Sequence, residues 1–563
     1  MDPIWIRSYP QGVPAQIDAN ALGTIADYLD DAVHLHADRA AFVSGATGER
    51  LLFSELDTRT RQVAAYFQGV LKLPNGSRVA LMMPNLLQFP VCLLGLLRAG
   101  YVVVNINPQY TPRELEHQLA DSGAVAIIVL DLFAHTVAQV VAKTAVRHVV
   151  VTGLADMMPT LKRAVANFVI NRLQKLVPDY ALPDSIGFRE VLAQGARTEV
   201  AAVALDVDDL ALLQYTGGTT GVSKGAMLTH GNVLANIKQV QVWGAPFVDA
   251  SDELISITAI PMYHIFALGT CLSLLGMGGT NVLVADARDI DGFVKVMAKY
   301  RCVSLAAVNT VFNSLLNHPD FAKLDFSALR LAVGGGAAVQ RAVAERWQQL
   351  TKTPLIEGYG LTECSPTVAV NPYDLPAYNG SIGLPLPSTE VSIRNAQGQE
   401  LPLGYAGELC VRGPQVMRGY WQRPADTAAV MTADGFLRTG DVAVMDAQGF
   451  LKIVDRIKDM ILVSGFNVYP NEVEDVAMLH PGVLEVAAVG QSCEATGEAV
   501  KLFVVKRSPA LTEQMLLKHC SQSLTAYKVP RQIEFIGALP KSTVGKILRR
   551  ELRDRVEIKR ELS

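Results

Sequence analysis

The sequence predicts an α/β protein with a large N-terminal domain, made of two βαβ-type sheet subdomains and a β subdomain, and a small α+β C-terminal domain. Short Val/Ile/Leu runs alternate with longer helical patterns, first around 78–130 and again over 253–357. After Ser381 the runs become shorter and are separated by Gly, Pro and Asn. Strand–helix–strand alternation is typical of parallel sheets covered on both faces, whereas closely spaced short strands favour antiparallel pairing.

Size and composition narrow the class of protein. A chain of 563 residues is too long for one core, and with half of its residues apolar and 18% charged it can bury a large interior. The net charge of −4 and the lack of a long basic run before the C-terminus argue against nucleic acid as a partner. Seven cysteines without CxxC or Cys/His ligand spacing fit reduced cytosolic thiols. With no secretory signal at the N-terminus, we expect a cytoplasmic protein.

Residues 265–285 carry no charge and are numerous enough to span a bilayer. Gly276, Gly278 and Gly279 divide them into a helix-like and a strand-like piece. We therefore expect a buried helix–turn–strand unit.

A second segment, 161–176, has an amphipathic helical pattern. Its apolar residues at helical spacing are Leu161, Val165, Phe168, Val169, Leu173 and Leu176, and its basic residues are Lys162, Arg163, Arg172 and Lys175. A basic amphipathic helix can lie on an anionic membrane. The pattern favours a surface helix packed on the core, and leaves peripheral membrane association open as the alternative.

The Gly-rich stretch QYTGGTTGVSKG, residues 214–225, follows an apolar strand-like run. Glycines leave backbone N–H groups free to approach an anion, and hydroxyls add donors. Val222 and Ser223 separate Gly221 from Lys224, whereas a Walker A loop has its lysine directly after the glycine. We therefore predict ATP binding of another kind than in kinases or GTPases. The candidate phosphate-binding residues are Thr216, Gly217, Gly218, Thr219, Thr220, Gly221 and Lys224.

Two further segments carry weaker signals. His264 follows an aromatic residue and precedes an apolar helix, where a lone histidine is more often a core residue than a catalyst. The glycines Gly334, Gly335 and Gly336 at a predicted strand end allow a planar ring to approach the backbone closely.

Three segments offer groups that complement the Gly-rich loop. In EGYGLTECSP, Tyr359 offers a stacking face, and Thr362 and Glu363 offer oxygens to phosphate-bound magnesium. Asp441 offers a carboxylate to two ribose hydroxyls. Lys546, after a Gly-containing turn, offers a mobile counter-charge for carboxylate and phosphate oxygens.

Together, and in this order, these motifs resemble the adenylate-forming superfamily of acyl-CoA synthetases, luciferases and peptide-synthetase adenylation domains, over nearly the whole chain. The stretch 434–458, DGFLRTGDVAVMDAQGFLKIVDRIK, is similar to the signature of fatty acyl-CoA synthetases. The runs NPQYTPRELEHQLADSGA and DRIKDMILVSGFNVYPNEVEDV resemble those of bacterial long-chain fatty acyl-CoA synthetases.

The resemblance implies two half-reactions that use ATP, Mg²⁺ and CoA. A fatty carboxylate attacks the α-phosphorus of ATP to give acyl-adenylate and pyrophosphate, and the CoA thiol then displaces AMP, which feeds fatty-acid degradation and uptake. By this resemblance Lys546, Thr216, Glu363 and His264 are catalytic, and Glu363 with Thr216 holds the metal ion. The implied nucleotide- and CoA-binding residues include the loop 216–224, Gly334–Gly336, Tyr359, Gly360, Thr362, Asp441, Ile453, Arg456, Lys458 and Gly465.

The resemblance also implies an N-terminal domain, 1–455, and a mobile C-terminal domain, 456–563, that swings about Lys458 between the half-reactions. Lys546 then leaves the site, and Gly465 approaches the pantetheine path. The chain departs from some relatives at two positions. Leu462 stands where some carry a second lysine, and Leu268 stands where some fatty acyl relatives carry a gating tryptophan.

Several alternatives remain at this point. A medium-chain or aryl-acid ligase would carry the same motifs. An acyl-AMP ligase that loads a carrier protein tends to have an insertion near the hinge, and 439–474 has none. A non-catalytic fatty-acid carrier at the membrane is disfavoured by the intact motifs. We expect a homodimer, located in the cytoplasm or peripherally on the inner face of the cytoplasmic membrane.

Overall fold

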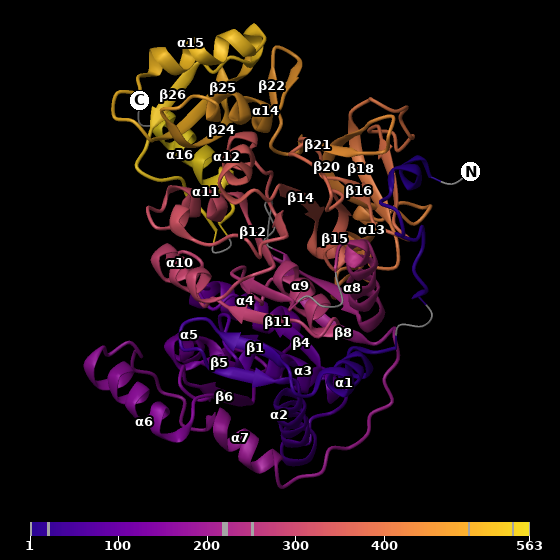
Figure 1. Ribbon diagram of the computed structural model, residues 1–563, viewed down its shortest axis with the longest axis vertical. Helices are drawn as coiled ribbons and strands as arrows, with labels where there is room; N and C mark the ends of the chain where they lie inside the picture. The colour runs from indigo at the N-terminus through magenta and orange to yellow at the C-terminus, as the bar shows by residue number, and fades with distance from the viewer. Residues whose placement is uncertain are drawn as a thin grey trace.

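A computed structural model describes residues 3–19, 23–216, 223–248, 253–493, 496–542 and 545–561. In this part of the chain the strands form four sheets. Figure 1 shows the C-terminal region at one end of the molecule, the β subdomain beside it, and the two large sheets with their helices below. The predicted fold class is confirmed, including the smaller C-terminal domain.

The first large sheet is parallel over most of its width. Its central strands are buried on both faces, as expected for Val/Ile/Leu-rich strands covered by helices. In spatial order its strands are β19 (Gly419–Tyr420), β9 (Lys224–Thr229), β8 (Leu210–Thr216), β4 (Val102–Asn105), β3 (Arg78–Met82), β5 (Ala126–Leu130), β6 (His148–Thr152) and β7 (Ile186–Gly187). Helices of this region are α2 (Phe53–Ala65), α3 (Gln88–Arg98), α4 (Pro112–Ser122), α5 (Asp131–Val140), α6 (Thr160–Phe168), α7 (Phe188–Gly195) and α8 (His230–Gly244).

The second large sheet incorporates an N-terminal hairpin, β1–β2, which sequence alternation alone did not assign to it. In spatial order the strands are β16 (Leu384–Pro385), β15 (Thr367–Val370), β14 (Leu355–Gly360), β13 (Leu331–Gly334), β12 (Ser304–Ala307), β10 (Ile255–Thr258), β11 (Thr280–Leu283), β1 (Ala40–Ser44) and β2 (Arg50–Leu52). Its helices are α1 (Ile25–His36), α9 (Ile265–Gly276), α10 (Ile290–Lys299), α11 (Asn309–Asn317) and α12 (Arg341–Thr351). The core strands β10–β14 are parallel, so their carboxyl ends meet at one edge.

The remaining two sheets follow the change of sequence texture. The β subdomain is antiparallel, with β17 (Glu390–Arg394), β18 (Gly407–Arg412), β20 (Leu437–Met445) and β21 (Leu451–Arg456). Helix α13 (Pro424–Val430) precedes β20 in the chain. The C-terminal sheet contains β22 (Ile461–Val463), β23 (Phe466–Val468), β24 (Val483–Cys493), β25 (Gly497–Lys506) and β26 (Gln532–Phe535). Its helices are α14 (Pro470–Met478), α15 (Glu513–Ser523) and α16 (Arg549–Glu561).

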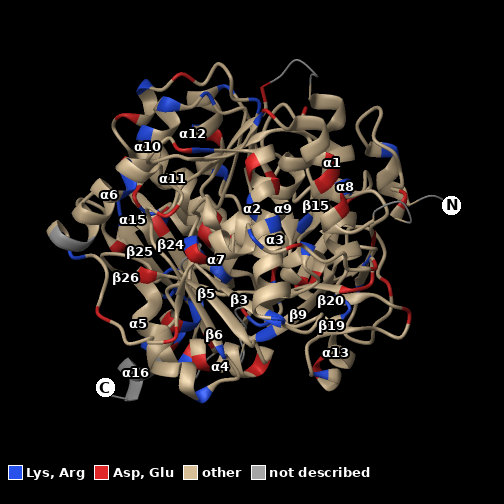
Figure 2. Ribbon diagram, turned by 90° about the horizontal axis from the view of Figure 1, so that it is seen from below, with Lys and Arg blue, Asp and Glu red and all other residues tan. Residues whose placement is uncertain are grey.

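The uncharged stretch 265–285 folds as expected, as the helix α9 followed by a turn and the strand β11. No helix among the described residues is both long and apolar enough to cross a bilayer. No disulfide joins any of the seven cysteines, all of which lie in the described part. Figure 2 shows acidic and basic residues interleaved over the fold.

The prediction that the helix at 161–176 packs on the core is wrong. Helix α6 continues as a π-helical turn over Val169–Leu173, and none of its described residues is buried. Leu161 is 80% exposed and Phe168 is 59% exposed. The segment projects from the side of the molecule (Figure 1), because it is an excursion between β6 and β7 that lies outside the sheet's helical layers.

Candidate active site

A cavity of about 1630 Å³ lies where the second large sheet, the β subdomain and the C-terminal domain meet. It opens at the carboxyl ends of β12 and β13, which is where open α/β sheets bind ligands. Many of the residues predicted to act together line it: Thr216, Lys224, His264, Gly335, Gly336, Tyr359, Gly360, Thr362, Glu363, Asp441, Ile453, Arg456, Lys458 and Lys546.

Two of the described candidates, Gly334 and Gly465, do not line this cavity. Gly334 faces away, and a Cβ built there would lie 2.3 Å from Val339. Gly465 lies in the exposed turn between β22 and β23. The loop residues Gly217, Gly218, Thr219, Thr220 and Gly221 lie outside the described residues.

Lys546 reaches the cavity from the C-terminal domain. Its turn is held by two hydrogen bonds with Ser542, and Thr310 of α11 donates to the carbonyl of Gly545 at 3.0 Å. A Cβ at Gly336 would lie 3.4 Å from Lys546 Cε, so the bare glycine backbone lets the lysine approach β13 closely. Loss of solvation, and secondly the charge of Arg456, lower the pKa of Lys546 to about 8.

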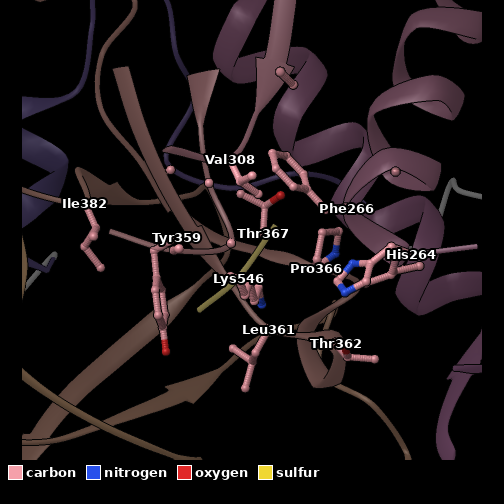
Figure 3. A pocket seen from close by; sticks show the side chains of 18 of the residues that line it. His264, Phe266, Val308, Tyr359, Leu361, Thr362, Pro366, Thr367, Ile382 and Lys546 are labelled. Atoms are coloured by element: carbon pink, nitrogen blue, oxygen red, sulfur yellow. The ribbon is translucent and has the colours of Figure 1, made fainter. Parts of the chain in front are cut away.

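His264 precedes α9 and lies near Lys546 (Figure 3). Burial, reinforced by the positive charge of Lys546, lowers its pKa to about 3, so the imidazole is neutral at physiological pH. Its Nδ1 is buried without a hydrogen-bond partner among the described residues. His264 is the N-cap residue of α9, so the positive end of the helix dipole lies beside it, and no side chain caps this end. This wall of the cavity therefore suits an anionic or polar group.

Asp441 is the centre of a polar group on the opposite side. The hydroxyl of Tyr359 donates to its Oδ2 at 2.5 Å, and Arg456 Nε lies 3.3 Å from its Oδ1. The Asp441 side chain is 12% exposed. It is therefore oriented by two donors before any ligand binds.

Two residues that the sequence did not single out contact residues of the predicted phosphate site. Tyr420 donates to Glu363 Oε1 at 2.7 Å, and Asp426 Oδ1 lies 2.7 Å from Lys224 Nζ. Glu363 is 57 residues from Tyr420, and Lys224 is 202 residues from Asp426, so no local pattern reveals either pair. In the sequence, the segment around Tyr420 is marked only by two adjacent aromatic residues after a glycine, GYW at 419–421.

The cavity continues between α8 and α9, where apolar side chains dominate its wall. They include Val240, Phe247, Ile265, Phe266, Leu274 and Met277. Phe266 contacts the backbone at Gly335, since a Cβ there would lie 3.0 Å from its ring. Leu268 is 1% exposed and belongs to the main core, so this position faces away from the cavity.

The donor set fits Mg²⁺ delivered with a nucleotide. No cluster of three or more metal-ligating side chains occurs among the residues that the structure describes. Magnesium, however, is usually held by one or two carboxylates together with substrate phosphates and water. Glu363, with one oxygen already bound to Tyr420, matches that arrangement.

Comparisons with known proteins agree with this geometry. The AMP-binding enzyme family matches residues 29–421, and the AMP-binding enzyme C-terminal domain matches residues 472–546. A long-chain-fatty-acid–CoA ligase of Escherichia coli O6:H1 is 56% identical, covering 98% of both chains. That of Haemophilus influenzae is 51% identical over 100% of both chains, and that of Bacillus subtilis is 35% identical over 97% of both chains.

Solved structures share the fold. A crystal structure of an anthranilate CoA ligase with anthranoyl-AMP has a TM-score of 0.85 at 23% identity, covering 97% of this chain and 100% of that one. ATP-bound MatB from Rhodopseudomonas palustris has a TM-score of 0.78 at 28% identity, covering 94% of this chain and 99% of that one.

Proposed function

Since the chain belongs to the AMP-binding enzyme family, we propose that it is an AMP-forming ligase that activates long-chain fatty acids to acyl-CoA through an acyl-adenylate. The substrates are ATP, a fatty acid and CoA, and the products are acyl-CoA, AMP and pyrophosphate. The observation that carries this function is the position of Lys546. It lines the cavity between polar residues such as Asp441 and Glu363 and the apolar wall that includes Phe266 (Figure 3).

The first half-reaction brings two anions together, and the site offsets their repulsion. We assign Lys546 to bridge the substrate carboxylate and the α-phosphate, and neutral His264 to border the carboxylate. A preorganised donor of this kind typically contributes about 10²–10³ in rate. The N-terminal end of α9 adds a favourable field for the carboxylate.

The nucleotide is assigned to the polar side. Asp441 accepts hydrogen bonds from the ribose, Tyr359 and Gly336 border the base, and Thr216 and Lys224 border the β- and γ-phosphates. Glu363, with Thr216, would hold Mg²⁺, which neutralises phosphate charge when bound. Each role is a proposal supported by the shared cavity.

A product assay tests the function. Palmitate, ATP, Mg²⁺ and CoA should give palmitoyl-CoA, AMP and pyrophosphate, and Lys546→Ala should slow adenylate formation by about 10²–10³. Formation of ADP, or acyl-adenylate that accumulates despite CoA, would contradict it. A panel of medium-chain and aryl acids gives the selectivity, because an apolar pocket discriminates by only about 1–3 kcal/mol per methylene.

We further propose that the domains 1–455 and 456–563 rotate about Lys458 between the two half-reactions. In the present arrangement Lys546 is in the site and the β22–β23 turn with Gly465 is exposed, as the first half-reaction requires. A disulfide that holds the domains in this arrangement should permit pyrophosphate exchange and block thioester formation. Equal loss of both activities would contradict the rotation.

Peripheral attachment to the inner face of the cytoplasmic membrane is a second proposal, and α6 supports it. Residues 160–176 contain four basic residues and no acid, and their apolar side chains Leu161, Val165 and Phe168 are exposed. Leu161→Glu/Phe168→Glu should abolish sedimentation with anionic liposomes while leaving the activity on dissolved substrate intact. Unchanged sedimentation would exclude α6. Light scattering, which gives the molar mass in solution, tests the expected homodimer.

A further inference from the structure

Tyr420 stands between two groups that act on the phosphates. Its hydroxyl donates to Glu363 Oε1 at 2.7 Å, and Lys224 Nζ lies 5.3 Å from the centroid of its ring. The side chain is 8% exposed. One residue thus contacts both the candidate metal ligand and the candidate phosphate cation.

Backbone hydrogen bonds fix Tyr420 relative to both groups. The short strand β19 pairs with β9, placing Tyr420 opposite Ala226, and the N–H of Trp421 donates to the carbonyl of Gly225 at 2.8 Å. The N–H of Met417 donates to the backbone carbonyl of Glu363 at 2.7 Å. Residues 417–421 therefore join the strand that begins at Lys224 to the turn that carries Glu363.

The chemistry of these contacts favours a role in orientation. A donor to one carboxylate oxygen fixes the carboxylate and leaves the other oxygen for a metal ion, as outer-shell partners of metal ligands do. An aromatic face attracts an ammonium group.

We propose that Tyr420 is a positioning residue for the first half-reaction. Its hydroxyl orients Glu363 toward the metal ion that accompanies ATP, and its ring keeps Lys224 beside the β- and γ-phosphates. This inference rests on the proposed function, because that function assigns the metal to Glu363.

Binding of Mn²⁺·ATP, followed by electron paramagnetic resonance without fatty acid or CoA, provides a readout independent of turnover. Tyr420→Phe keeps the ring and removes the hydroxyl, so the affinity for Mn²⁺·ATP should fall by about 10- to 100-fold. Tyr101→Phe is the matched control, since Tyr101 is fully buried and its hydroxyl donates to the carbonyl of Leu73 outside the cavity. An affinity of Tyr420→Phe equal to that of the control would overturn the proposal.

The two half-reactions separate positioning from a general structural defect. Adenylate formation by Tyr420→Phe should be slow at low Mg²⁺ and recover at high Mg²⁺, whereas thioester formation from supplied acyl-adenylate should match the control. Equal loss in both half-reactions, without recovery by Mg²⁺, would also overturn it. If the wild type binds Mn²⁺·ATP but forms no acyl-adenylate, the proposed function fails, and the binding comparison still decides the role of Tyr420.

Discussion

The charge of Lys546 should set the alkaline limit of adenylate formation. Its pKa is lowered to about 8, from about 10.4 for an ordinary lysine, by loss of solvation and by Arg456. The charged form is needed and exists below this pKa. Above pH 8, kcat/KM for ATP should therefore fall about tenfold per pH unit, because this parameter reports the free enzyme.

Substitution of Lys546 separates its charge from its shape. Arginine keeps its charge to above pH 12, so Lys546→Arg should be slower than the wild type yet lose the decline above pH 8. Below pH 8, Lys546→Ala should lose about 10²–10³ in rate, and it should lack the decline above pH 8. Thioester formation from supplied acyl-adenylate should be little affected by either change.

The assay is ATP–pyrophosphate exchange with palmitate between pH 6.5 and 10. Lys458 also lines the cavity, and loss of solvation together with Arg456 lowers its pKa to about 8 as well. Lys458→Arg is therefore the matched control. If the alkaline decline persists in Lys546→Arg and disappears in Lys458→Arg, the assignment to Lys546 is refuted.

Three further predictions concern charges that the structure buries or pairs. Burial raises the pKa of Glu357 to about 8, so between about pH 5 and 8 the folded protein holds a proton that the unfolded chain lacks. Its contribution to stability should fall by about 1.4 kcal/mol per pH unit, and Glu357→Gln should flatten the dependence of Tm on pH; parallel curves would contradict this. Arg549→Met should lower C-terminal domain stability by about 3–5 kcal/mol in thermal denaturation because it leaves Glu474 buried without its partner at 2.8 Å. Recovery in Arg549→Met/Glu474→Leu would confirm the cause. Asp426→Asn should raise ATP affinity in calorimetry by up to about fivefold, since it frees Lys224 from a half-exposed ion pair; weaker binding would show that Asp426 supports the site instead.

Local patterns predicted many of the elements, and most of the described residues that they singled out line one cavity. Short apolar runs between helical patterns identify β3, β4 and β5, and the glycines after Gly276 correctly separate α9 from β11. These signals are local because burial on both faces of a parallel sheet requires continuous apolar runs. The pairing of β1 with β11 needs contacts across more than 200 residues, which no window of sequence contains.

Two helices show that composition alone does not predict which face of a helix is exposed to solvent. Acids and bases interleave along the C-terminal helix α16, a composition typical of a solvated face, yet its Arg549 and Arg553 contact the buried acids Glu474 and Asp459. The opposite error occurs at α6, whose apolar residues are exposed. Amphipathic spacing gives the face of a helix, and only the surrounding layers decide whether that face is covered.

The sequence by itself determined the order of the motifs, the Gly-rich stretch without Walker A spacing and the resemblance to adenylate-forming enzymes, because each depends on residues close together in the chain. The tertiary structure alone decided that Lys546 stands beside Gly336, that Tyr420 joins Glu363 to Lys224, and that position 268 faces the core. These contacts depend on how separate sheets and domains pack. Side chains from distant segments share one cavity only when the whole chain has folded around it.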